Sequence, residues 1–485
     1  MNARKLEEVE VDTRDIRKFL DVHDEARVTE IQGRAEKLRA LVGGHTIWNV
    51  NSTAVGGGVA EMLQPMLAFS RGLGLDARWL VISGPPEFFQ LTKRIHHALH
   101  GQNGDGSTLG AAERDIYEAT LRENADDLIS RVKPGDFVIL HDPQTAGLAP
   151  LLMDAGLHVI WRCHIGYDLR NTESDLGWNF LRPYVEHVPA LIFSKRRYAP
   201  TWCDPDRVVK IQPSIDAFSA KNQDLDPHSA LAILVQADLV AGEPPDEGTA
   251  RFRYIDGSEG RVERQAVVDR AGDPPPQDAP LVVQVSRWDP LKDMMGVMMG
   301  FVKMIERSPE IGAHLVLAGP NVHAVADDPE APQVYQEVLA KWKELPDAVR
   351  ERVHLANLPV DDVTENAIIV NALQRHAAIV VQKSFKEGFG LTVTEAMWKG
   401  RAVVASAVGG IIEQIEDGVD GCLLEDPADL DSFADILERL LKDDELRENI
   451  GTAAREKVRV QFLGIRHLTD YANLIEQLLA RSLAD

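Results

Sequence analysis

The chain has 485 residues, of which 44% are hydrophobic and 26% are charged, and this composition excludes disordered, collagen-like and coiled-coil organisation. Its length exceeds what one hydrophobic core usually serves, so we expect two domains. The formal net charge of −24 disfavours binding to nucleic acid or to anionic membranes, because an acidic surface repels phosphate at long range. A phosphate group must therefore be bound at a local site.

The three cysteines, Cys163, Cys203 and Cys422, are widely spaced. They indicate neither a disulfide framework nor a structural zinc site. The N-terminal sequence is charged where a signal peptide would be apolar, and no apolar run approaches the length of a membrane span. We therefore expect a cytoplasmic protein.

The first 215 residues alternate short apolar runs with longer amphipathic segments. The apolar runs are HTIWNVNS (45–52), DARWLVISG (76–84), DFVILHDPQ (136–144), HVIWRCHIG (158–166), ALIFSK (190–195) and VVKIQPSID (208–216). This spacing is typical of βαβ units around a parallel sheet. It predicts an N-terminal Rossmann-like domain over residues 1–215, with residues 1–40 as an extension.

A second series of the same kind predicts another parallel sheet, in a domain over residues 216–465. Its apolar runs are APLVVQVSRWDP (279–290), AHLVLAGP (313–320), VHLANLP (353–359), AAIVVQKS (377–384), AVVASAVGG (402–410) and GCLLED (421–426). Residues 466–485 have apolar residues at helical spacing, which predicts an amphipathic helix that could dock on either domain, including the N-terminal one. Residues 235–279 are Pro-rich at both ends and contain a turn-forming DGSEG, so we interpret them as an insertion or a linker elaboration with a β-hairpin.

The sequence KEGFGLTVTE (386–395) follows a predicted strand and leads into a helix. Its glycines fall in the turn between them, where free backbone amides and the helix dipole favour an anion. Glu387 and Glu395 would then contact opposite ends of a ligand whose phosphates sit on the backbone. The alternative is a tight turn with a solvated Glu387 and a helix-stabilising Glu395.

Two cations follow the first strand of the second series, in VSRWDPLKD. Arg287 and Lys292 lie at the carboxyl end of that strand, where parallel α/β sheets bind ligands, and both can bind phosphate. The alternative is a surface ion pair of Arg287 with Asp289 and of Lys292 with Asp293.

The first domain offers polar residues at three predicted strand ends. Gly56, Gly57 and Gly58 precede a helix, HDPQ (141–144) ends one strand, and WRCHIGYD (161–168) ends another. Asp142, Gln144, Arg162 and His164 are suited to sugar hydroxyls, although each could equally be a structural residue. The sequence contains no metal-ligand motif.

Together these motifs resemble the retaining glycosyltransferases of family 4, which have the GT-B fold of two Rossmann-like domains facing an interdomain cleft. The resemblance rests on the R-x4-K pair, on EGFGLTVTE and on the Gly-rich loop of the first domain. More closely, NSTAVGGGVAEML, HDPQ, WRCHI and VSRWDPLKD resemble trehalose synthases of the glycosyltransferring type and the related retaining trehalose phosphorylases. The resemblance covers about residues 45–475, apart from the insertion at 235–279.

By this resemblance, Arg287 and Lys292 hold the phosphates of the donor, Glu387 contacts its glucose and Glu395 contacts the ribose of its nucleotide. Further donor contacts are implied for Gly57, Gly58, His164, Gly388, Phe389, Gly390, Leu391 and Thr392. Asp142, Gln144 and Arg162 are our candidates for binding the acceptor sugar. The resemblance implies neither a metal nor another cofactor.

The implied activity is reversible transfer of glucose from an NDP-glucose to glucose, with retention, to give α,α-trehalose. One alternative is a retaining trehalose phosphorylase, which converts trehalose and phosphate to α-glucose 1-phosphate and glucose. Glu395 favours a nucleotide sugar, because orthophosphate has no ribose, whereas the insertion slightly favours the phosphorylase. A third alternative is a non-catalytic sugar-binding protein on a degenerate transferase fold. The expected partners are these small molecules, and a second copy of the chain, in a homodimer, is a further candidate.

Overall fold

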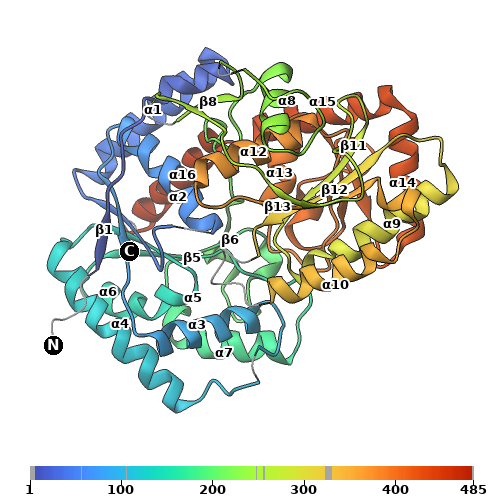
Figure 1. Ribbon diagram of the computed structural model, residues 1–485. Coiled ribbons are helices and arrows are strands. Elements are labelled where there is room, and N and C mark those ends of the chain that lie inside the picture. Colours follow the sequence, from blue (N-terminus) through green and yellow to red (C-terminus); the bar gives the residue numbers. More distant parts are fainter. Residues whose placement is uncertain are drawn as a thin grey trace. The chain divides into compact units, whose positions relative to one another are not determined.

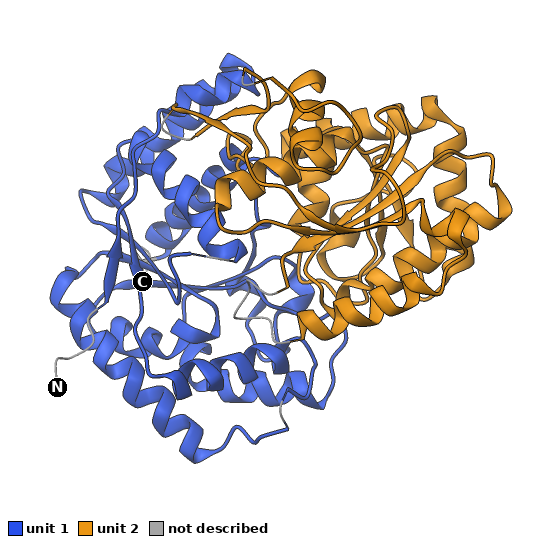
Figure 2. Ribbon diagram, in the orientation of Figure 1, with its two compact units in different colours: residues 1–214, 462–485 blue, residues 215–461 orange. Residues whose placement is uncertain are grey.

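The computed structural model describes residues 6–55, 57–104, 106–246, 248–254, 257–322 and 330–482. They divide into two compact units (Figures 1 and 2). Unit 1 comprises residues 1–214 and 462–485, and unit 2 comprises residues 215–461. Sequence analysis placed the two boundaries after residues 215 and 465.

Unit 1 is built on a seven-stranded sheet with the order β1-β3-β2-β4-β5-β6-β7. Its strands are β1 (Glu7–Val9), β2 (Ile47–Asn51), β3 (Ala77–Val81), β4 (Phe137–His141), β5 (His158–Cys163), β6 (Ala190–Phe193) and β7 (Val208–Lys210). Neighbouring strands are parallel, as predicted, except that β1 pairs antiparallel with β3. Part of the N-terminal extension is therefore an edge strand. Its sequence, EEV, is too short and too polar to show the apolar pattern by which the other strands were predicted.

Helices cover both faces of this sheet (Figure 1). One face carries α1 (Glu25–Val42), α2 (Gly58–Gly72) and α16 (Gly464–Ser482), and the other carries α3 (Pro86–Leu99), α4 (Ala111–Arg131), α6 (Ala149–Asp154) and α7 (Thr172–Val185). The short helix α5 (Asp142–Thr145) and the 3-10 helices η1 (Ile16–Asp21), η2 (Ala146–Leu148), η3 (Arg196–Tyr198) and η4 (Pro205–Arg207) lie in the connections. The C-terminal helix α16 packs against α1 and α2.

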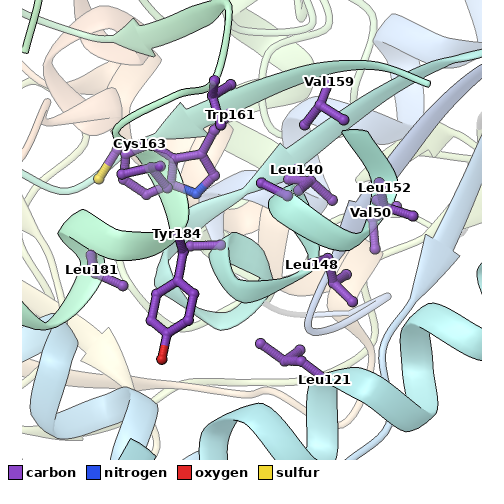
Figure 3. Packing of buried hydrophobic residues seen from close by; sticks show 14 of the residues in the cluster. Val50, Leu121, Leu140, Leu148, Leu152, Val159, Trp161, Cys163, Leu181 and Tyr184 are labelled. Atoms are coloured by element: carbon purple, nitrogen blue, oxygen red, sulfur yellow. The ribbon is translucent and has the colours of Figure 1, made fainter. Parts of the chain in front are cut away.

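The main core of unit 1 lies between the sheet and the second helical face. Figure 3 shows Leu140 and Trp161, from adjacent strands, among side chains of the covering helices such as Leu121 and Leu181. All four side chains are almost fully buried. Because a parallel sheet is covered on both faces, its strands read as continuous apolar runs, and this is why they were recognisable in the sequence.

Unit 2 contains a second seven-stranded sheet, with the order β10-β13-β12-β11-β14-β15-β16. Its strands are β10 (Val267–Asp269), β11 (Leu281–Val285), β12 (His314–Pro320), β13 (Val353–Leu358), β14 (Ile379–Gln382), β15 (Ala402–Ser406) and β16 (Cys422–Leu424). The edge strand β10 is antiparallel to β13, and the other pairs are parallel.

The helices of unit 2 also form two groups (Figure 1). They are α8 (Pro227–Gln236), α9 (Met294–Arg307), α10 (Ala331–Lys343), α11 (Asp347–Arg350), α12 (Val363–His376), α13 (Leu391–Trp398), α14 (Leu430–Lys442) and α15 (Asp444–Gln461), with the 3-10 helices η5 (Pro290–Lys292) and η6 (Gly409–Glu413). Helices α9 and α14 pack together, as do α8 with α12 and α13 with α15. Among the described residues, no helix has the length and apolarity needed to cross a bilayer.

The segment 235–279 is partly integral to unit 2. Its hairpin consists of β8 (Arg251–Arg253) and β9 (Glu259–Arg261), which pair antiparallel. Its last strand, β10, is the edge of the main sheet, so this part of the segment belongs to the domain and is no linker.

The N-terminal segment packs closely against α2, and a substitution at Gly72 tests this contact. A Cβ added at Gly72 would lie 1.8 Å from the Arg14 carbonyl oxygen, whereas at Gly33, in α1, no described atom lies within 4 Å. We expect Gly72→Ala to lower the free energy of unfolding by about 1–3 kcal/mol through overpacking. Gly33→Ala should raise it by up to about 1 kcal/mol through helix propensity. Chemical denaturation of both variants measures this, and equal effects would contradict the close approach of the N-terminal segment.

Candidate active site

The loops that follow β11 and β14 are joined by one buried glutamine. Gln284 donates from Nε2 to the Lys292 carbonyl oxygen at 2.7 Å, and its Oε1 accepts from the Lys383 amide at 2.9 Å. Its side chain is fully buried, and β11 and β14 are neighbours in the sheet. The amide therefore fixes the two loops at the carboxyl edge, where a parallel sheet binds ligands.

Lys292 and Glu387 meet at this edge. The Lys292 Nζ lies 2.6 Å from each carboxylate oxygen of Glu387, and both side chains are mostly buried. The alternative pairing of Lys292 with Asp293 is wrong, because Asp293 forms an ion pair with Lys383 instead. An ammonium has three N–H donors, so Lys292 keeps a donor for a further anion.

Arg287 lies near the same loop but is more exposed. Its Nη2 lies 2.8 Å from Asp289 Oδ2, which is the ion pair weighed as the alternative, and the arginine side chain is 57% exposed. The other oxygen of Asp289 accepts from the Leu291 amide at 2.8 Å. Asp289 thus orients Arg287 from a fixed position, and an exposed guanidinium can still bind phosphate oxygens.

The loop after Glu387 runs directly against the turn at η6. A Cβ at Gly409, whose φ is 54°, would lie 1.7 Å from the Glu387 carbonyl oxygen. The Gly410 amide donates to the carbonyl of Gly388 at 2.9 Å. Only glycine permits this approach at residue 409, so the turn holds the loop, and with it the Glu387 carboxylate.

The rest of the motif is fixed by two glutamines. Gln414 Nε2 donates to the Phe389 carbonyl, and Thr392 Oγ1 donates to Gln382 Oε1 at 2.8 Å. Gly390, with a φ of 85°, is the N-cap of α13. The Val393 amide donates to the Gly390 carbonyl at 3.0 Å, while the amides of Leu391 and Thr392 precede the first hydrogen bond of the helix, where an anion can bind.

Glu395 lies about one turn inside α13, which begins at Leu391. It is 5% exposed, and its Oε1 lies 3.7 Å from the Nζ of Lys221. Lys399, one turn further on, donates to the Glu395 carbonyl and to Asn222 Oδ1, both at 3.1 Å. Desolvation lowers the pKa of Lys399 to about 7. Glu395 therefore lies in a buried polar environment that the sequence did not reveal.

In unit 1, the predicted glycine loop opens α2. Gly57 is the N-cap, with a φ of 80°, and Gly58 is the first helical residue. No described atom lies within 4 Å of a Cβ built at Gly57, so the space beside its backbone is open. Gly56 lies outside the described residues.

A chain of neutral polar groups lies at the carboxyl ends of β4 and β5. His141 Nε2 lies 3.0 Å from Asn49 Oδ1, and His141 Nδ1 lies 3.1 Å from His164 Nε2. Asn49 Oδ1 can only accept, so His141 donates from Nε2 and accepts at Nδ1, and His164 donates from Nε2. His164 Nδ1 is then a hydrogen-bond acceptor, and a sugar hydroxyl can donate to such a group.

Asp142 holds His164 from the other side. Its Oδ1 accepts from the His164 amide at 2.7 Å, and its own φ is 63°, a left-handed conformation. Desolvation raises the pKa of the Asp142 carboxyl to about 7 and lowers the pKa values of His141 and His164 well below their usual range. Both imidazoles are therefore uncharged at neutral pH.

The Arg162 side chain is directed to the C-terminal helix. It is 1% exposed, and its Nη1 donates to His467 Nε2 at 2.8 Å and to the Tyr471 hydroxyl at 2.6 Å, both on α16. His467 in turn donates from Nδ1 to Ser214 Oγ, since its Nε2 accepts. Placed in this way, Arg162 anchors the C-terminal helix, and its contact with an acceptor sugar stays a prediction.

Gln144, the remaining acceptor candidate, lies in α5 and its side-chain oxygen Oε1 is buried without a hydrogen-bond partner among the described residues.

Sequence reasoning missed Asn49, His141, Lys221, Gln284, Lys383, His467 and Tyr471. A histidine directly before Asp142 was visible as part of HDPQ, but the other six stand in no motif. Among the described residues, no group of three or more His, Cys, Asp or Glu side chains could hold a metal ion.

Comparison with known proteins identifies the class of the fold and of its two domains. The family model "Trehalose synthase, N-terminal domain" matches residues 49–200, and "Glycosyl transferases group 1" matches residues 269–457. The α,α-trehalose 6-phosphate synthase from Burkholderia multivorans has a similar fold, with a TM-score of 0.64 at 15% identity, covering 90% of this chain and 100% of that one. A sucrose-phosphate synthase from Thermosynechococcus elongatus has a TM-score of 0.61 at 15% identity over 90% and 100% of the two chains. The fold and the matched domains define a glycosyltransferase with the GT-B fold.

The family follows from the relatives. A trehalose synthase of Pyrococcus horikoshii is 35% identical over 467 residues, covering 96% of this chain and 97% of that protein. One of Rubrobacter xylanophilus is 33% identical over 93% of this chain and 94% of that protein. The chain belongs to this trehalose synthase family. A trehalose phosphorylase of Pleurotus sajor-caju is 26% identical over 84% of this chain but 54% of its own length. The non-catalytic alternative is wrong, because the chain is a glycosyltransferase.

The raised pKa of Asp142 predicts a pH dependence of stability. Between about pH 4 and pH 7 the folded carboxyl holds a proton that the unfolded chain has released, so unfolding free energy falls as the pH rises. Asp142→Asn removes this term, and asparagine tolerates a positive φ. We expect the variant to gain on the order of 3 kcal/mol relative to wild type between pH 4.5 and pH 7.5. Urea denaturation across this range measures it, and parallel curves would contradict the assignment.

Proposed function

We propose that the protein transfers glucose from an NDP-glucose to glucose, with retention and reversibly, to form α,α-trehalose. The observation that carries this proposal is the Lys292–Glu387 pair at the sheet edge of unit 2. It supplies a cation for the leaving phosphate beside a carboxylate for the sugar hydroxyls, in a chain that belongs to the trehalose synthase family.

The donor would bind to unit 2. Its diphosphate would contact Lys292, Arg287 and the free amides at the start of α13, and these groups stabilise the negative charge that develops as the glucosyl bond breaks. Glu387 would bind glucose hydroxyls, and Glu395 would bind the ribose. Because both oxygens of Glu387 contact an ammonium, this carboxylate is a poor nucleophile, in agreement with a mechanism that forms no glucosyl-enzyme.

The sugar contacts of unit 1 would be hydrogen bonds between neutral groups. His164 Nδ1 would accept from a glucose hydroxyl, and Asp142 and Gln144 would contact the acceptor. In the transfer step, the bond from C1 to the leaving phosphate breaks, and the acceptor hydroxyl forms the new bond on the same face. The proton of that hydroxyl passes to the departing phosphate oxygen, so the step requires no protein base. Independence of metal, a cytoplasmic location and a homodimeric state remain predictions.

A trehalose phosphorylase is the second candidate, because phosphorylase relatives match 84% of the chain. Inorganic phosphate would then occupy the place of the donor's distal phosphate, and Lys292 and Glu387 would have the same roles. Incubation with trehalose and either NDP or phosphate, followed by identification of the glucosyl product, distinguishes the two. Glucose 1-phosphate without NDP-glucose would replace our proposal with the phosphorylase.

We predict that Lys292→Ala and Arg287→Ala each lower kcat at least about a hundredfold, since each removes a positive charge from the leaving phosphate. Lys303→Ala is the matched control, because Lys303 pairs with Asp431 on the surface of unit 2. Steady-state kinetics with NDP-glucose measure the effect, and thermal melting checks the fold. Turnover near wild type in both site variants would exclude the diphosphate assignment.

Glu395→Gln separates the two candidate reactions. Loss of the ribose contact should raise the KM for NDP-glucose by about tenfold, the equivalent of one lost charged hydrogen bond. Phosphorolysis of trehalose should change little, because phosphate has no ribose. An unchanged KM for NDP-glucose in a folded variant would exclude Glu395 as the ribose contact.

A further inference from the structure

Unit 1 contains a pocket that shares no lining residue with the candidate active site. Its volume is about 510 Å3, and it lies along the edge strand β7, between the start of β6, η4 and the last turns of α16. Four basic residues line it, Arg196, Arg207, Lys210 and Arg481, and Asp206 is the one acidic residue among its described lining residues.

The arginine side chains contact neutral backbone groups. Arg196 Nη1 donates to the Val208 carbonyl at 2.8 Å, and Arg481 donates to the Asp206 carbonyl from both Nη atoms at 3.4 Å. Within the described residues, neither guanidinium has a carboxylate at ion-pair distance. A guanidinium has five N–H donors, so these contacts leave several donors on each arginine for a ligand.

Arg207 is held in the same manner. Its Nη1 donates to the carbonyls of Glu186 and Val188, at 2.6 and 3.1 Å, and its Nε lies 3.6 Å from a half-exposed carboxylate of Asp204. The backbone carbonyls thus hold the arginine in place without neutralising its charge. The chain has a net charge of −24, whereas more cationic than anionic side chains line this pocket. The local charge is therefore opposite in sign to that of the whole chain.

We propose that this pocket binds a small phosphorylated metabolite of the sugar phosphate class. Like charges repel one another across a pocket, and an anion between them removes that repulsion. Arginine binds phosphate oxygens bidentately, and the pocket volume lies within the usual range of about 300–1,000 Å3 for small-molecule sites. Apolar walls from Val209, Leu474 and Leu478 can pack against the carbon face of a sugar.

The ligand would contact the helix that anchors Arg162. Arg481 lies near the end of α16, and His467 and Tyr471, on the same helix, bind the Arg162 guanidinium in β5. Binding at the pocket therefore acts on the helix that also satisfies the buried guanidinium of Arg162. The inference does not depend on which trehalose reaction the enzyme catalyses.

Calorimetric titration of the full chain with glucose 6-phosphate tests the proposal, because this compound is a substrate or product of neither candidate reaction. Glucose is the uncharged probe and inorganic phosphate is the probe without a sugar. We expect glucose 6-phosphate to bind more tightly than phosphate, and glucose not to bind at this pocket. Arg196→Gln and Arg481→Gln should each raise the Kd at least about tenfold, which corresponds to one lost charged hydrogen bond.

Arg197→Gln is the matched control, since Arg197 is exposed, adjacent to Arg196 and outside the pocket lining. Its Kd should equal that of wild type, and thermal melting checks that every variant is folded. Binding that survives in both pocket variants would overturn the proposal, as would a loss confined to Arg287→Ala, which places the phosphate in the donor site. Phosphate binding as tight as that of glucose 6-phosphate would overturn the sugar phosphate assignment, and absence of binding at millimolar concentration would overturn the site.

Discussion

The buried amide of Gln284 is the constraint on which the arrangement in unit 2 depends. One side chain donates to the loop after β11 and accepts from the loop after β14, so the two loops cannot move independently. Lys292 and Glu387 lie 95 residues apart in sequence, and their contact requires this register. A buried amide with both ends satisfied stabilises one arrangement of the loops, because any other leaves a polar group unpaired.

The two units differ in the electrostatics of the side chains at the carboxyl ends of their strands. Unit 2 presents charged side chains, Lys292 and Arg287, which match a diphosphate. Unit 1 presents neutral imidazoles, because burial lowers the pKa values of His141 and His164. Neutral donors and acceptors suit hydroxyl groups, which carry no net charge and are recognised by direction of hydrogen bonding.

The C-terminal helix completes unit 1 although it is the last segment of the chain. Its His467 and Tyr471 satisfy the buried guanidinium of Arg162, and an unpaired buried charge would cost several kcal/mol. The helix also forms one wall of the basic pocket through Arg481. The last helix of the chain therefore both satisfies a buried charge of the sheet and completes the basic pocket.

The sequence by itself determined both parallel sheets, because strands buried on two faces read as apolar runs, and it located Arg287, Lys292, Glu387, Asp142 and His164 at strand ends. It also determined the family, through motifs whose spacing is local. Only the tertiary structure decided which charges pair: Lys292 with Glu387, Asp293 with Lys383, and Arg162 with α16. Local spacing tells which residues share a sheet edge, but the partner of a charge depends on contacts between segments some 90 to 300 residues apart, and on which of them are desolvated together.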